Sequence, residues 1–216
     1  MSKRKWSLTV KIITALTAWV ALALQLYILI DNTPDNGMTP LQAVGRFFIF
    51  FTVLSNLLVA ISLTIELAGR TTVAGQFFSR PSTSAAIAFY IVMVGLVYNV
   101  ILRNVWNPTG LQKLVDELLH VVIPLLYAIY WIVFVRKGTL RWNHLLYWLI
   151  YPATYLFYAL VRGAIEGFYP YPFMNVTELG YGQVLVNCAG LLIVFSIIGF
   201  LFVVIDRMID RQTKLQ

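Results

Sequence analysis

Six long apolar runs divide the chain, and they constrain its fold more than any other feature of the sequence. Each run holds roughly 20 mostly apolar residues, the length that an α-helix needs to cross the hydrocarbon core of a bilayer. Transmembrane β-strands would be about half as long and would alternate apolar with polar residues. The runs cover residues of about 8–30, 41–67, 84–102, 111–135, 142–161 and 184–205. They predict an all-α integral membrane protein, a bundle of six transmembrane helices.

Composition supports a membrane protein. Hydrophobic residues make up 60% of the chain and charged residues only 12%, about half the charged share of a soluble domain. With 216 residues, six spans leave little room for a soluble domain, so we expect one domain over residues 1–216. The first run follows three basic residues as in a signal peptide, but its length and the lack of a cleavage site predict a retained helix.

The basic residues predict the orientation. If both termini are on one side, 12 of the 16 Lys and Arg residues lie on that side: Lys3, Arg4, Lys5, Lys11, Arg70, Arg80, Arg136, Lys137, Arg141, Arg207, Arg211 and Lys214. The other side has only Arg46, Arg103, Lys113 and Arg162. Because cytoplasmic loops are enriched in Lys and Arg, both termini should be cytoplasmic. The net charge of +7 is then a topology signal and an attraction to membrane lipids, and we expect no nucleic-acid partner.

The stretch DELLHVVIP, residues 116–124, places charged groups in the fourth run. Ionisable residues inside a span are costly and suggest function. Asp116 stands four residues before His120 and Glu117 three before it, so either carboxylate could orient the imidazole. The alternative is a snorkelling carboxylate pair beside a hydrogen-bonded packing histidine.

The stretch FFTVLSN in the second run carries a small and polar stripe that includes Thr52, Ser55 and Asn56. Such a stripe can simply be a helix-packing face. However, Thr52 lies ~17 Å and His120 ~14 Å from the outer ends of their helices, counting 1.5 Å per residue. A hydroxyl and an imidazole at similar depth could form a nucleophile and its base.

A third polar cluster is predicted at the outer membrane surface. Tyr98, Asn99 and Arg103 end the third run, and Arg162 follows the fifth. The two arginines could snorkel to the headgroups or bind an anionic ligand.

The connection after the fifth run contains FYPYPF, residues 168–173. Its two prolines disfavour helix at Tyr169 and Tyr171. This aromatic segment could be an interfacial belt or a lid over a cavity.

Metal and cofactor sites are not expected. The Glu117–His120 spacing matches one half of a carboxylate-bridged di-iron motif, but such bundles need a second copy. The chain has only two histidines, and its single cysteine, Cys188, lies in the last run.

Taken in order, FFTVLSN, DELLHVVIP and YPYPFMNV resemble the androgen-induced family of six-helix membrane threonine hydrolases, which includes the androgen-dependent regulator of tissue-factor-pathway inhibitor. The resemblance is greatest to its compact bacterial branch, sometimes labelled Pr-six-Pr. It implies a multi-pass protein of the bacterial cytoplasmic membrane.

In the animal members of this family, a threonine and a histidine cleave fatty acid esters of hydroxy fatty acids. The resemblance therefore implies that Thr52 is the nucleophile and His120 the base of a lipid-ester hydrolase. Asp116 stands where the animal motif has asparagine and is a candidate orienting group. Asn56, Asn99 and Tyr98 are candidate oxyanion donors, and Arg103, Arg162, Tyr169 and Tyr171 are candidate substrate-binding residues. The alternative is a non-enzymatic transporter or binding protein for a small molecule or lipid, with a His–carboxylate site.

Overall fold

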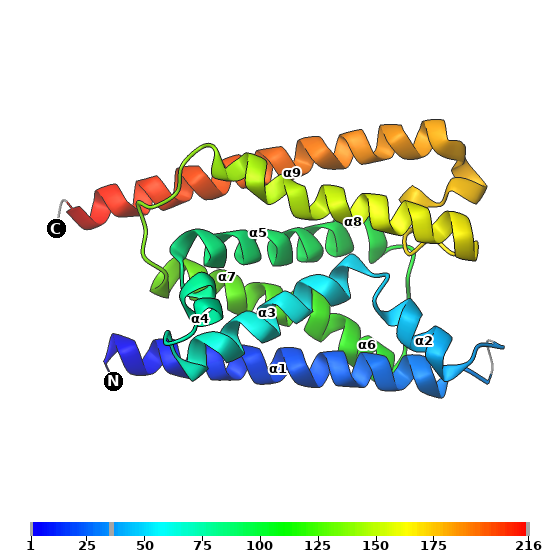
Figure 1. Ribbon diagram of the computed structural model, residues 1–216, viewed down its shortest axis with the longest axis horizontal. Coiled ribbons are helices and arrows are strands. Elements are labelled where there is room, and N and C mark those ends of the chain that lie inside the picture. Colours follow the sequence, from blue (N-terminus) through cyan, green and yellow to red (C-terminus); the bar gives the residue numbers. More distant parts are fainter. Residues whose placement is uncertain (1, 35–36, 215–216) are drawn as a thin grey trace. The chain divides into compact units, whose positions relative to one another are not determined.

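The computed structural model describes residues 2–34 and 37–214, and in these residues it contains helices but no strand (Figure 1). The chain divides into two compact units, Met1–Arg136 and Lys137–Gln216, where the sequence predicts one domain. The first unit contains α1 (Lys3–Asp31), α2 (Pro40–Phe47), α3 (Phe51–Ala68), α4 (Val73–Phe78), α5 (Pro81–Val97), η1 (Tyr98–Leu102), α6 (Gly110–Glu117), η2 (Leu118–Val122) and α7 (Ile123–Phe134). The second contains α8 (His144–Glu166), η3 (Pro172–Met174) and α9 (Val176–Lys214).

Six helical segments among the described residues are long and apolar enough to cross a membrane, which confirms the predicted all-α membrane fold. They are Lys3–Asp31, Phe51–Ala68, Pro81–Leu102, Gly110–Phe134, His144–Glu166 and Val176–Lys214. Large apolar side chains also remain exposed on the outside of these helices, for example Val100 at 70% and Phe157 at 72%. In a membrane protein such faces are covered by lipid, which is as apolar as the side chains themselves.

The helix predicted over residues 41–67 is not continuous, which corrects the prediction. The chain leaves the helical conformation after Phe47 and resumes it at Phe51, with Phe50 extended at φ −84° and ψ 129°. The short α2 has its own start signal, because Thr39 and Gln42 form a capping box around Pro40. The break places α3, and not one long helix, across the membrane.

Small residues bring the helices of the first unit together. α1 packs against α3 and α7, and α5 packs against the same two helices (Figure 1). On α1 the buried face includes Ala15, Ala18 and Ala21, spaced by about one helical turn. Without large side chains between them, helix backbones can approach closely, which is the usual way that helices pack in a bilayer.

Glycines shape the second unit. Gly167 ends α8 in the left-handed conformation at φ 69°, and Gly180 kinks α9 at φ 74°. On α8, Gly163 leaves room for the ring of Tyr169, where a Cβ atom would collide. At the end of the aromatic segment, Pro172–Met174 form the short turn η3, which packs against α9.

If all six helices cross the membrane, both termini are expected on the same side, and the positive-inside rule predicts that this side is the cytoplasm. Single cysteines introduced into a Cys188→Ser background test this arrangement. We expect a membrane-impermeant thiol reagent to label Ser2→Cys and Thr213→Cys only from the cytoplasmic side, and Asn107→Cys only from the opposite side. Labelling of Ser2→Cys and Thr213→Cys from different sides would contradict an even number of spans.

Candidate active site

The break before α3 places Thr52 in the first turn of this helix. The first hydrogen bond within α3 runs from the Leu54 amide to the Phe50 carbonyl, at 3.1 Å. Thr52 therefore lies at the positive end of the helix dipole, where negative charge is stabilised. Thr52 is buried, with 8% of the residue exposed.

A second irregularity, in the fourth span, positions His120. Residues 118–122 form the π-helical turn η2, in which the Ile123 amide donates to the Leu118 carbonyl. Pro124 has no amide hydrogen, so it offers no donor to the His120 carbonyl four residues earlier or to the Leu119 carbonyl five residues earlier. Single π-turns of this kind are frequent at functional sites.

Two asparagines donate to these carbonyl groups. Asn56 Nδ2 donates to the Leu119 carbonyl at 3.3 Å and to the Thr52 carbonyl at 2.9 Å. The Asn56 amide group therefore connects α3 with η2 by hydrogen bonds, which is a structural role. In a bilayer, where backbone groups cannot turn to water, such side-chain partners are needed.

Asn99 makes the equivalent link from the third span. Its Nδ2 donates to the Gly95 carbonyl at 2.7 Å and to the His120 carbonyl at 3.4 Å. The helices meet closely here, because a Cβ atom on Gly95 would stand 3.1 Å from the His120 carbonyl oxygen and 3.3 Å from Pro124 Cβ. The backbone of His120 is thereby held from two sides.

The ring of His120 joins Thr52 to Asp116. His120 Nδ1 lies 2.9 Å from the Asp116 carbonyl oxygen, and since a carbonyl can only accept, Nδ1 carries the hydrogen. In the neutral ring Nε2 is then the acceptor, and it lies 3.3 Å from Thr52 Oγ1. In this tautomer the threonine hydroxyl can donate to His120 Nε2.

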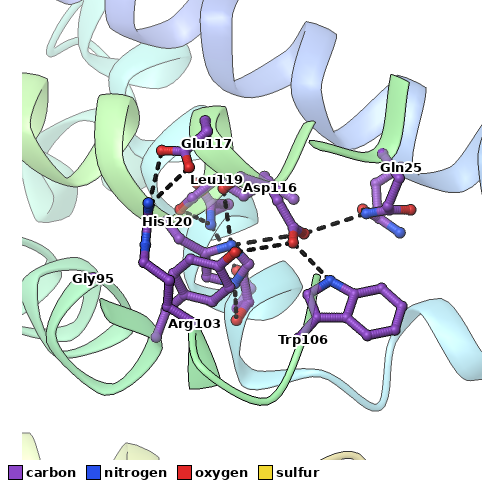
Figure 2. Close-up of polar contacts among 12 residues, drawn as sticks. Gln25, Gly95, Arg103, Trp106, Asp116, Glu117, Leu119 and His120 are labelled. Carbon is purple, nitrogen blue, oxygen red and sulfur yellow. Dashed lines mark hydrogen bonds and ion pairs between the residues drawn. The ribbon is translucent and has the colours of Figure 1, made fainter. Parts of the chain in front are cut away.

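The carboxylate of Asp116 has a different task from its carbonyl. It lies 3.9 Å from His120 Nδ1, and it accepts shorter hydrogen bonds from Tyr98 Oη at 3.1 Å, Trp106 Nε1 at 2.7 Å and Gln112 Nε2 at 3.2 Å. Figure 2 shows Trp106 pointing at this carboxylate. The buried carboxylate is thus an anchor for the surrounding side chains.

Aromatic stacking fixes the plane of the His120 ring. The ring of Tyr98 stacks on it with centroids 3.9 Å apart and an angle of 13°. The Arg103 guanidinium lies over Tyr98, 5.4 Å from the ring centroid.

Arg103 is also paired with Glu117 at 2.8 Å, and both side chains are more than a third exposed (Figure 2). The hydrogen bond to Glu117 raises the pKa of Arg103. This pair closes the cluster at the membrane surface.

The remaining predicted site residues lie in the second unit, where each has a partner. Arg162 pairs with Glu166 at 2.6 Å and donates to Tyr158 Oη at 2.9 Å. Tyr169 packs on Gly163, and Tyr171 stacks on Phe173 with centroids 5.3 Å apart.

Several residues of the site were not predicted from the sequence. Trp106 and Gln112 hold Asp116, Gln25 accepts a hydrogen bond from Gln112 at 3.0 Å (Figure 2), and Gly95 allows the close approach. Two features of the sequence could have indicated these contacts. Trp106 lies in a short loop near the acidic residue Asp116, and Pro124 follows His120 by four residues.

In the part of the chain that the structure describes, no three His, Cys, Asp or Glu side chains are grouped to hold a metal ion. Comparison with protein-family models, curated proteins and solved structures finds no match.

The close contact at Gly95 gives a stability prediction. Gly95→Ala inserts a methyl group against the immobile His120 carbonyl and Pro124, and such overpacking costs about 1–3 kcal/mol. The matched control is Gly190→Ala in α9, where a Cβ atom meets nothing within 4 Å. We expect Gly95→Ala to have a lower Tm in detergent than wild type and Gly190→Ala to match or exceed it. Equal Tm values for the two variants would show that α5 can move away from His120 freely.

Proposed function

We propose that the protein is an intramembrane hydrolase of lipid esters, with Thr52 as nucleophile and His120 as general base. The observation that carries this proposal is the Thr52 Oγ1–His120 Nε2 contact of 3.3 Å, on a ring whose other nitrogen donates to the Asp116 carbonyl. A hydroxyl next to an oriented base is the general arrangement of an activated nucleophile. The resemblance of FFTVLSN and DELLHVVIP to the threonine hydrolases supports the same assignment.

The first half-reaction forms an acyl-threonine. Thr52 Oγ1 bonds to the ester carbonyl carbon while its proton passes to His120 Nε2. The bond from this carbon to the ester oxygen then breaks, and the leaving oxygen takes the proton from His120 to become an alcohol. The Asp116 carbonyl stabilises the imidazolium that exists between these two transfers.

The second half-reaction releases the acyl group. A water molecule bonds to the acyl carbon and gives a proton to His120 Nε2. The bond to Thr52 Oγ1 breaks, and this oxygen recovers the proton, so the enzyme returns to its starting state with a fatty acid as product. The apolar surroundings limit water and strengthen the local electrostatics.

The developing oxyanion belongs at the first turn of α3. Asn56 and Asn99 use their amide hydrogens on backbone carbonyls, and Tyr98 donates to Asp116. We therefore assign these three residues a structural role and do not assign them to the oxyanion. The Val53 amide directly follows the nucleophile and precedes the first hydrogen bond within the helix. Together with the helix dipole, it is the donor that we assign to the oxyanion.

The substrate class follows from the resemblance and from the membrane. Esters of hydroxy fatty acids carry two apolar chains and a free carboxylate, which would lie at the headgroup level. Arg103 is at this level beside the site, and a substrate carboxylate would replace Glu117 on its guanidinium. An exposed ion pair contributes little to stability because solvent screens it, so this exchange is feasible.

The alternative, a carrier with an intramembrane His–carboxylate pair, fits the contacts less well. A proton or ligand site would need an available carboxylate beside the imidazole. The Asp116 carboxylate instead accepts three hydrogen bonds, and the imidazole binds the Asp116 carbonyl. This favours the hydrolase.

Loss of the hydroxyl or of the base should abolish ester cleavage. Thr52→Val and His120→Ala should each reduce the kcat for a lipid ester by at least about 10³-fold, because the two groups act as a unit. The matched control is Thr14→Val, another buried helical threonine, whose hydroxyl donates to Val10 within α1. A fluorophosphonate probe should modify Thr52 in wild type and Thr14→Val, but neither active-site variant. Full activity of a folded Thr52→Val protein would exclude the proposal.

Arg103 should recognise the substrate carboxylate. Arg103→Gln should raise the KM for an ester with a free carboxylate by about tenfold, the effect of losing one charge-assisted hydrogen bond. The KM for the corresponding methyl ester and the kcat for both should change little. An equal rise in KM for both esters would assign Arg103 to folding of the Tyr98–His120 stack and not to substrate binding.

A further inference from the structure

The first unit contains a cavity of about 690 Å³ far from Thr52. It lies between the first turns of α1 and the last turn of α3, and its lining includes Lys3, Arg4, Lys5, Lys11, Glu66 and Phe134. Glu66 is fourteen residues after Thr52 on α3, which corresponds to roughly 21 Å along the helix. The proposed hydrolase site uses none of these residues.

Three cations at the cavity lack a counter-charge. Lys3, Arg4 and Lys5 are exposed, and within residues 2–34 and 37–214 none of them forms an ion pair or a side-chain hydrogen bond. These three residues are consecutive in the chain. Their like charges repel one another, so a bound anion would stabilise them. The lining thus favours a ligand with negative charge.

Glu66 adds a second, independent requirement. Its side chain is only 3% exposed, and Oε2 accepts from Lys11 Nζ at 2.7 Å and from Tyr130 Oη at 2.9 Å. The other oxygen, Oε1, is buried and accepts no hydrogen bond from any described residue. A buried acceptor of this kind calls for a donor, which a hydroxyl group on the ligand would supply.

We propose that this cavity binds a phosphate ester of glycerol. The phosphate lies among Lys3, Arg4 and Lys5, and a glycerol hydroxyl donates to Glu66. The same chemistry occurs in the headgroup of phosphatidylglycerol and in free glycerol phosphate. Basic clusters at the end of a membrane helix are suited to anionic headgroups. The site is independent of the proposed ester hydrolysis, since it requires neither Thr52 nor His120.

Lipid retention by the full-length protein in neutral detergent tests the site. Native mass spectrometry would compare phosphatidylglycerol with phosphatidylcholine of the same acyl chains, which has no net charge and no hydroxyl donor. The cavity variant is Lys3→Gln/Arg4→Gln/Lys5→Gln, whose side chains are exposed, so its fold should persist. The control, Arg136→Gln/Arg211→Gln/Lys214→Gln, removes the same charge on the same predicted side, at residues that do not line the cavity.

We expect wild type and the control to retain phosphatidylglycerol in preference to phosphatidylcholine, and the cavity variant to lose at least about tenfold of this retention. Glu66→Gln should reduce the preference in the same direction, with a Tm check on folding. Displacement of the lipid by millimolar glycerol phosphate would identify the free ester as a ligand, and its failure would identify the lipid headgroup. Equal losses in both triple variants, or no preference over phosphatidylcholine in wild type, would overturn the proposal.

Discussion

Pro124 lacks an amide hydrogen, and the arrangement around His120 depends on how the affected carbonyl groups find other donors. In a bilayer these groups cannot turn to water, so side chains of neighbouring helices must reach them. Asn56 reaches the Leu119 carbonyl and Asn99 the His120 carbonyl. The same two contacts fix three spans around the imidazole. A proline that weakens one helix thereby helps to fix the position of the His120 imidazole.

Each nitrogen of the His120 ring has a partner that lies next to a backbone irregularity. The π-turn leaves the Asp116 carbonyl 2.9 Å from Nδ1, and the break before α3 leaves Thr52 at a helix start, 3.3 Å from Nε2. If both regions were regular α-helices, the same residues would be present, but there would be no π-turn before Pro124 and no helix start next to Thr52. The Asp116 carbonyl binds the His120 ring and its carboxylate binds the surrounding side chains, so these two polar groups have separate roles.

The helices were predictable from the sequence because spanning a bilayer requires long apolar runs, and hydropathy registers these directly. The break between Phe47 and Phe51 was not, because it has no proline and no Ser, Thr, Asp or Asn cap within residues 48–50. Similar helical depth suggested that Thr52 and His120 could pair, and in the structure their side chains lie in contact. Depth cannot specify rotation about the helix axis, however, so the sequence did not reveal that Asn56 and Asn99 would use their amides on carbonyls, or that Trp106 would reach Asp116.

The tautomer of His120 tests the central claim most directly. With only two histidines in the chain, His144→Gln leaves a single residue to observe by ¹⁵N NMR in protein with labelled histidine. We predict a neutral ring protonated at Nδ1 and unprotonated at Nε2, because the Asp116 carbonyl can only accept. A ring protonated at Nε2 would place a hydrogen between His120 and Thr52, and would contradict the role of His120 as the base.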